Sequence, residues 1–263
     1  RLPHRLGCLV PGSVGRDHLE PATACRVHHE VGLPSECMIY DVSNACLGLL
    51  NGMVQVASMI ELGQIRAGVV VGTECGRPLV EQTIEMLNRD KSLTRKSIKD
   101  SMASLTIGSA SVAMVLCDEQ LSRTQNHLTT AIVHCDTAGH ELCRSRGLET
   151  VMDTDSENLM QQGIATGNAA FTRFLGAAGW DVADVDKTFC HQVGATHRKQ
   201  LLERLGLEPG IDFATLDWLG NTGAAALPVT MALGIEQGHL DAGDRVAMLG
   251  IGSGINCLMV AVG

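Results

Sequence analysis

The stretch CLGLLNGMVQVASMIELGQIRAG at residues 46–68 returns in altered form as NTGAAALPVTMALGIEQGHLDAG at residues 221–243. Composition alone would make about one or two positions identical in a window of this length. A shift of 175 residues makes eight identical: Gly48 with Gly223, Val54 with Val229, Ala57 with Ala232, Ile60 with Ile235, Glu61 with Glu236, Gly63 with Gly238, Ala67 with Ala242 and Gly68 with Gly243. The repeat predicts two related halves, in which Cys46 and Asn221 stand at equivalent helix N-termini.

Short β-rich runs alternate with longer helical patterns along the chain. The predicted strands cover 6–10, 38–42, 68–72, 111–117, 128–134, 188–191 and 246–251, and the predicted helices cover 21–31, 47–62, 155–178, 195–205 and 224–237. The helices at 47–62 and 224–237 carry a single acidic residue each, so we expect them to be buried all round. Helices buried in this way need a sheet on both sides, which predicts an α/β fold in layers.

Composition excludes some classes of function. The 263 residues are 45% hydrophobic, with a formal net charge of −9, whereas nucleic acids and anionic membranes attract clustered Lys and Arg. No run of eighteen apolar residues free of charge is present, so no membrane span is expected. The chain opens on Arg1, and the apolar run at 6–10 already resembles a strand inside a sheet, so we expect an upstream segment to be missing.

The ten cysteines include no C-x-x-C pair, which is the spacing that zinc and redox sites favour. Cys135, His140 and Cys143 come nearest to a ligand cluster, and we expect no metal there. A chain of this size without a regular cysteine framework or a signal peptide fits a reducing, cytoplasmic environment.

Two residue types point to chemistry. A helix N-terminus offers free N–H groups, which lower the pKa of a thiol and can hold an oxyanion, so Cys46 is placed as a nucleophile. The alternative is one more small buried thiol. His191 ends the apolar run 185–190 and precedes a helix, a place typical of a catalytic loop, although a lone His also occurs as a structural residue.

Three motifs carry a family resemblance. They are Asp41-Val-Ser-Asn-Ala-Cys46-Leu-Gly48, His191-Gln-Val-Gly194 and Gly220-Asn221-Thr-Gly-Ala-Ala, and a fourth is Gly250-Ile-Gly252-Ser-Gly254. In order and spacing they resemble the β-ketoacyl-ACP synthase III group of the thiolase superfamily. The resemblance implies a five-layer αβαβα fold with two pseudo-symmetric halves, the incomplete first at 1–150 and the second at 151–263.

The resemblance also implies roles. Cys46 would accept an acyl group from a thioester, and His191 and Asn221 would stabilise the enolate of the second substrate. The N–H groups of Cys46 and of the loop Gly252, Ser253 and Gly254 would form an oxyanion hole. That glycine loop lies between two terminal strands with no helix after it, so we reject a nicotinamide site and expect no cofactor besides coenzyme A thioester substrates.

Glu20 separates two reactions within the family. It lies 26 residues before Cys46, on the stretch that in this family reaches across a dimer interface. In the branch that joins two acyl-CoAs head to head, for olefin or ketone synthesis, a Glu at this place would remove the α-proton, which a decarboxylating enzyme does not need. The alternative is a solvated residue in the first turn before Pro21.

The resemblance therefore favours a homodimeric, non-decarboxylative acyl-CoA condensing enzyme that forms a β-keto acid. Its near alternative is a decarboxylative β-ketoacyl-ACP synthase III, so that acyl-CoA or acyl-ACP would be the carrier. A Cys–His hydrolase and a non-catalytic thiolase-like subunit remain as other classes. Arg198 is a candidate for binding coenzyme A phosphates, against an ordinary place on a helix surface.

Overall fold

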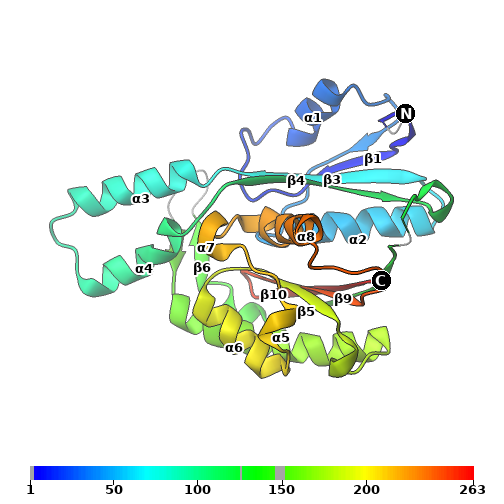
Figure 1. Cartoon of the computed structure of the whole chain (residues 1–263). Coiled ribbons are helices and arrows are strands. Elements are labelled where there is room, and N and C mark those ends of the chain that lie inside the picture. The colour runs from blue at the N-terminus through cyan, green and yellow to red at the C-terminus, as the bar shows by residue number, and fades with distance from the viewer. Residues whose placement is uncertain (1–2, 125, 146–151) are drawn as a thin grey trace.

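In the computed structural model, described for residues 3–124, 126–145 and 152–263, helices and sheets alternate in five layers (Figure 1). Helix α1 (Thr23–Val31) covers one sheet, α2 (Gly48–Glu61) and α8 (Ala226–Glu236) lie between the two sheets, and α5 (Ser156–Ala178) and α6 (Ala195–Leu205) cover the other sheet. The expected αβαβα arrangement is confirmed.

The first sheet has the strand order β2-β1-β3-β4. Its strands are β1 (Cys8–Pro11), β2 (Met38–Ile39), β3 (Ala67–Glu74) and β4 (Ala110–Cys117). Strand β1 runs parallel to β2 and β3, whereas β3 and β4 are antiparallel.

The second sheet has the order β5-β10-β9-β8. Its strands are β5 (Leu128–Cys135), β8 (Lys187–Cys190), β9 (Val246–Gly252) and β10 (Asn256–Val262). Strands β8 and β9 are parallel, and β9 and β10 are antiparallel. The three strands β8, β9 and β10 thus repeat the arrangement of β1, β3 and β4, which confirms the two pseudo-symmetric halves.

The chain passes from the first sheet to the second sheet before it reaches the predicted boundary between the halves. Strand β5 precedes residue 150 but pairs with β10 of the second sheet, so the change falls between β4 and β5. Residues 150 and 151, at which the boundary was drawn, lie outside the described residues.

Helix α2 can lie between the two sheets because it has two apolar faces, one toward each sheet. Leu50 and Met53 pack with the second sheet's Met248 and Leu258, and Leu49 packs with the strands of the first sheet. Each such leucine contributes roughly 1.5–3 kcal/mol through removal from water. The prediction that both middle helices are buried all round is wrong in their C-terminal halves, where Gln55 and Ser58 of α2 and Ile235 of α8 are exposed.

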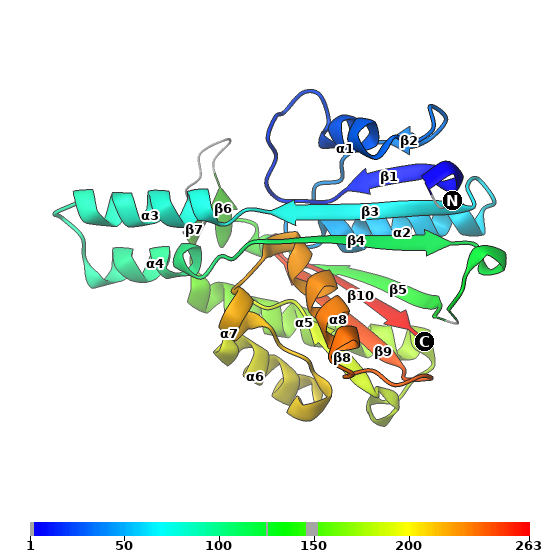
Figure 2. The ribbon, with the colours of Figure 1, turned by 45° about the horizontal axis from the view of Figure 1, so that its top comes forward.

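Some elements were not predicted. Helices α3 (Arg77–Arg89) and α4 (Arg95–Leu105) form an arm that projects from the layers (Figure 2), and β6 (Cys143–Ser145) pairs with β7 (Met152–Thr154) in a small separate sheet. The short helix α7 (Leu216–Leu219) precedes Asn221. In contrast, α6 has the predicted bounds, and Gly206 ends it in the left-handed conformation. None of the described helices has the length and apolar character needed to span a membrane.

Candidate active site

Cys46 stands on a sharp turn that leads into α2. The residue before it, Ala45, has a φ of 43°, a left-handed conformation that is costly for a residue with a Cβ. The turn packs closely against the end of β1, since a Cβ on Gly48 would lie 2.2 Å from the carbonyl oxygen of Gly12. The sequence therefore needs glycine at 48 so that the turn that carries Cys46 can pack against the end of β1.

The predicted oxyanion loop lies against this turn. A Cβ on Gly252 would lie 3.5 Å from the Cβ of Cys46, and the Ser253 N–H lowers the pKa of the Cys46 thiol. Gly254 has a φ of 136°, a value that favours glycine. The loop from the second half and the nucleophile from the first half are thereby brought together.

A chain of amides joins these two segments. Asn256 donates from Nδ2 to Asn44 Oδ1 at 3.3 Å and to the Ser253 carbonyl at 3.0 Å, and Asn44 donates to Asn51 Oδ1 at 2.7 Å. Sequence reasoning gave no role to Asn44 or Asn256, although Asn44 stands in the quoted cysteine motif. The motif could have drawn attention to Asn44, but nothing in the sequence indicated its hydrogen-bond partner Asn256, which lies 212 residues away.

The pKa of Cys46 departs from the expectation. The residue is half-buried as a whole, but its sulfur lies inside the protein. Burial raises the pKa of the Cys46 thiol to about 12, assisted by Cys143 and the carboxylate of Glu74, while the N–H groups of Cys46 and Ser253 lower it. The predicted lowering of this pKa by the helix start is wrong, because desolvation of a thiolate outweighs a few N–H groups. Cys46 is a thiol at neutral pH, and the predicted role as a nucleophile would need a proton acceptor.

His191 is suited to that task. It follows β8, and its backbone N–H donates to the Leu249 carbonyl at 3.1 Å, so it lies beside the C-terminal half of β9. Burial, and to a lesser degree His197, lower the pKa of His191 to about 4. Within the described part of the chain, neither ring nitrogen has a hydrogen-bond partner. A neutral imidazole of this kind can accept a proton at one nitrogen and donate from the other.

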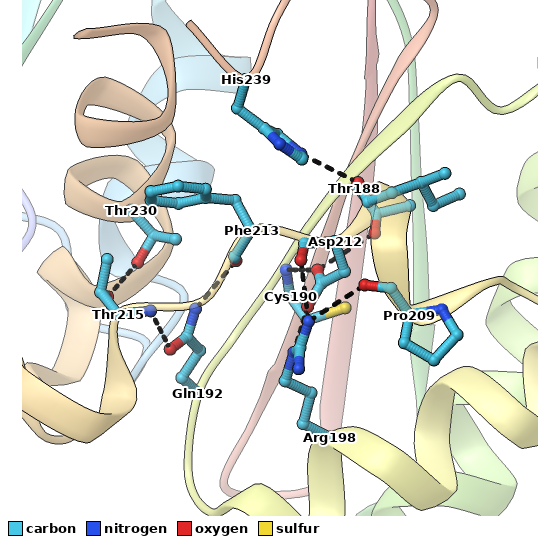
Figure 3. Close-up of polar contacts among 11 residues, drawn as sticks. Thr188, Cys190, Gln192, Arg198, Pro209, Asp212, Phe213, Thr215, Thr230 and His239 are labelled. Atoms are coloured by element: carbon cyan, nitrogen blue, oxygen red, sulfur yellow. Dashed lines mark hydrogen bonds and ion pairs between the residues drawn. The ribbon is translucent and has the colours of Figure 1, made fainter. Parts of the chain in front are cut away.

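The Arg198 guanidinium is engaged in contacts within the protein (Figure 3). Its guanidinium pairs with the buried carboxylate of Asp212 and also donates to the carbonyls of Asp212 and Pro209. Asp212 accepts further hydrogen bonds from the Thr188 hydroxyl and the Cys190 N–H. These contacts hold the end of β8 that carries His191, and they give no support to a coenzyme A contact by Arg198, which stays a prediction.

Gln192 connects the histidine to the segment that leads to the asparagine (Figure 3). Its Nε2 donates to the Phe213 carbonyl at 3.2 Å, and its Oε1 accepts the Thr215 N–H at 2.9 Å. The buried Thr215 hydroxyl is 2.7 Å from that of Thr230 on α8. One side chain therefore satisfies two backbone groups of the loop before α7.

Asn221 is fixed by the other half of the molecule. Its N–H donates to the Thr106 carbonyl at 2.9 Å, and its carbonyl accepts the Gly108 N–H at 2.8 Å. Its Oδ1 accepts the N–H of Gly223 at 3.0 Å, so the Nδ2 is the group left to donate to a ligand. Asn221 stands two residues before the 3-10 turn Gly223–Ala225 that leads into α8, as Cys46 stands two residues before α2.

Glu20 does not share this environment within one chain. It lies on the loop between β1 and α1 with its side chain exposed, whereas His191 is buried. The prediction that Glu20 serves the site of a second subunit stays a prediction. Among the described residues, no group of three His, Cys, Asp or Glu side chains could hold a metal ion.

Comparison with known proteins places this chain in a family. The family described as 3-oxoacyl-[acyl-carrier-protein] synthase III, C-terminal, matches residues 175–263. Acyl-CoA:acyl-CoA alkyltransferase of Shewanella oneidensis is 42% identical in a match that covers 98% of this chain and 76% of that protein. This chain belongs to the acyl-CoA:acyl-CoA alkyltransferase family. It is thereby one of the acyltransferases of the thiolase superfamily.

Solved structures in and around the family have the same fold. A glutamate variant of Xanthomonas campestris OleA superposes with a TM-score of 0.94 at 33% identity, over 99% of this chain and 76% of that one. The 3-oxoacyl-(acyl carrier protein) synthase III FabH of Xanthomonas oryzae superposes with a TM-score of 0.93 at 34% identity, over 98% of this chain and 76% of that one. The thiolase-like fold expected from the motifs is confirmed.

Proposed function

We propose that the chain condenses two fatty acyl-CoAs without decarboxylation, through an acyl group on Cys46, to a β-keto acid. The observation that carries the proposal is the approach of Cys46 to Gly252 of the second half, the half that also carries a neutral His191 and the Asn221 amide. The alkyltransferase of Shewanella oneidensis, whose name states an acyl-CoA donor and an acyl-CoA acceptor, is 42% identical to this chain.

In the first half-reaction the Cys46 sulfur attacks the thioester carbonyl. The carbon–sulfur bond to coenzyme A breaks, and the thiol proton passes through His191 to the departing coenzyme A sulfur. The N–H groups of Cys46 and of the loop Gly252, Ser253 and Gly254 are oriented to hold the oxyanion. Because the pKa of Cys46 is raised, this proton transfer accompanies the attack.

In the second half-reaction a base removes the α-proton of a second acyl-CoA. His191 and the Asn221 amide donate to the enolate oxygen, and the α-carbon then attacks the acyl carbon and displaces the Cys46 sulfur. Hydrolysis of the resulting β-ketoacyl-CoA gives the β-keto acid, so that two acyl-CoAs and one water yield one β-keto acid and two coenzyme A. We propose that this product enters head-to-head olefin synthesis.

The base in this scheme is Glu20 of a second subunit. Support comes from the OleA variants of Xanthomonas campestris, in which a glutamate and a cysteine were replaced. These two residues stand as far apart in that sequence as Glu20 and Cys46 do in this one. An exposed Glu20 on a loop is also free to enter another subunit.

The remaining parts of the proposal concern substrates and surroundings. The carrier is coenzyme A in preference to acyl-carrier protein, no resident cofactor takes part, and the active form is a homodimer. A reducing cytoplasm suits the protein because all ten cysteines are free thiols and Cys46 acts only when reduced.

The proposal is tested by incubating the purified protein with myristoyl-CoA alone. We expect release of coenzyme A together with a β-keto acid, and we expect Glu20→Ala to acylate Cys46 normally while losing most of the condensation. The alternative is a decarboxylative synthase III, which the similarity to FabH favours. A strict requirement for a malonyl thioester would establish that alternative, and full condensation by Glu20→Ala would exclude this base.

A further inference from the structure

Glu74 is a buried carboxylate between the segments that carry Glu20 and Asn221. It is the last residue of β3 and is 8% exposed. Burial raises the pKa of its carboxyl group, while hydrogen bonds from the N–H groups of Val14, Gly15 and Ala224 lower it. A carboxylate in such a place is costly unless its oxygens are satisfied, so its contacts indicate what it is for.

All three partners of Glu74 are backbone N–H groups of functional segments. Oε1 accepts from Val14 at 2.7 Å and from Ala224 at 3.2 Å, and Oε2 accepts from Gly15 at 3.3 Å. Val14 and Gly15 lie on the loop that continues to Glu20, and Ala224 lies in the turn that follows Asn221. One side chain therefore joins the two segments, although 150 residues separate it from Ala224.

The surroundings leave little freedom for another arrangement. A Cβ on Gly223 would lie 3.1 Å from both Cδ and Oε1 of Glu74, and Gly223 has a φ of +58°. The Ser13 hydroxyl accepts the N–H of Thr73 at 2.8 Å, which ties the start of the same loop to β3. Glycine at 223 lets the asparagine turn close onto the carboxylate.

We propose that Glu74 is a positioning residue for carbon–carbon bond formation, which holds the Glu20 loop and the Asn221 turn in one fixed relation through its two oxygens. This inference rests on the proposed function, since it assigns Glu74 to the half-reaction in which Asn221 and Glu20 act. Acylation of Cys46 depends on the Gly252–Gly254 loop and His191, and neither donates to Glu74. The Glu74 carboxylate acts on Cys46 through charge, and its effect on the pKa of the thiol is smaller than that of burial.

The test is Glu74→Gln, which keeps the shape but replaces one oxygen by an NH2 group that faces an N–H donor. Rapid-quench mass spectrometry with myristoyl-CoA measures acylation of Cys46, and product analysis measures condensation. We expect acylation within about threefold of wild type and condensation lowered at least tenfold, because a misplacement of about 1 Å can cost up to 100-fold in rate.

Two further variants keep the result decisive. Gly223→Ala pushes the asparagine turn away from an intact carboxylate and should also lose condensation in preference to acylation. Thr83→Val removes a buried hydrogen bond to the Leu79 carbonyl on the distant helix α3 and should spare both half-reactions. Equal losses in both half-reactions for Glu74→Gln, or no loss in either, would overturn the proposal.

Failure of the proposed function is recognised separately, in the wild-type protein. If wild type condenses only with a malonyl thioester, the non-decarboxylative reaction is wrong. Glu74→Gln is then assayed with the malonyl thioester, where Asn221 still holds the enolate, and the same preferential loss of condensation is expected.

Discussion

At the scale of single residues, the candidate site contains a thiol and an imidazole that are both neutral at neutral pH. Burial raises the pKa of Cys46 to about 12 and lowers that of His191 to about 4. An ion pair between them would be formed at a large cost in this environment. The attack on a thioester and the loss of the thiol proton are therefore expected to occur in one step.

His197 gives a measurable pH dependence of stability. Burial lowers its pKa from 6.5 to about 4, so on acidification the unfolded chain takes up this proton before the folded chain does. The contribution of His197 to folding is lost as pH falls from about 6.5 to 4. Between pH 7 and pH 5 it amounts to about 2 kcal/mol.

We therefore expect the free energy of unfolding of His197→Leu to fall by about 2 kcal/mol less than that of wild type when the pH is lowered from 7 to 5. Urea unfolding at the two pH values measures the free energy of unfolding for both proteins. Equal falls in the free energy of unfolding of the two proteins would contradict the prediction, because they would show that folding does not change the pKa of His197.

At the scale of elements, backbone contacts between the halves position Asn221. The segment between α4 and β4 runs beside it, with a parallel bridge from Ile107 to Asn221. The approach is close, since a Cβ on Gly108 would lie 1.7 Å from the carbonyl oxygen of Leu219. Gly220, with a φ of +70°, adopts the left-handed conformation that this approach requires.

Gly108→Ala should consequently displace the asparagine turn. Overpacking of this kind costs about 1–3 kcal/mol, and we expect condensation to fall at least tenfold while Cys46 is still acylated. Thermal unfolding and the two half-reaction assays measure these effects. The control is Gly176→Ala in α5, where a Cβ meets no atom within 4 Å and helix propensity favours alanine by up to about 1 kcal/mol; wild-type activity in Gly108→Ala would contradict this role.

At the scale of the whole molecule, the two halves each supply residues of the candidate site. The first half presents Cys46 at the start of α2, and the second presents His191 after β8 and Asn221 before α8. Figure 1 shows the two middle helices side by side between the sheets. Under the proposed function, the exposed Glu20 loop of a second subunit would complete the site.

Subunit complementation tests that arrangement. A dimer made of one Glu20→Ala subunit and one Cys46→Ala subunit, purified by two different tags, would contain one Cys46 site served by an intact Glu20 from the other subunit. We expect about half of the wild-type turnover per dimer, although each parent homodimer is inactive. An inactive mixed dimer would place Glu20 and Cys46 of the same chain in one site.

The sequence by itself determined the layered fold, and it predicted the reacting residues. The repeat required two halves with buried helices, and the motifs identified Cys46, His191 and Asn221, because local periodicity and glycine spacing are written along the chain. Only the tertiary structure decided that Arg198 faces Asp212, that Asn44 meets Asn256, and that Glu74 holds two loops. It also reversed the expected pKa shift of Cys46. Burial and pairing between separate elements, from 14 residues apart for Arg198 and Asp212 to 212 for Asn44 and Asn256, arise from packing, and no local pattern records them.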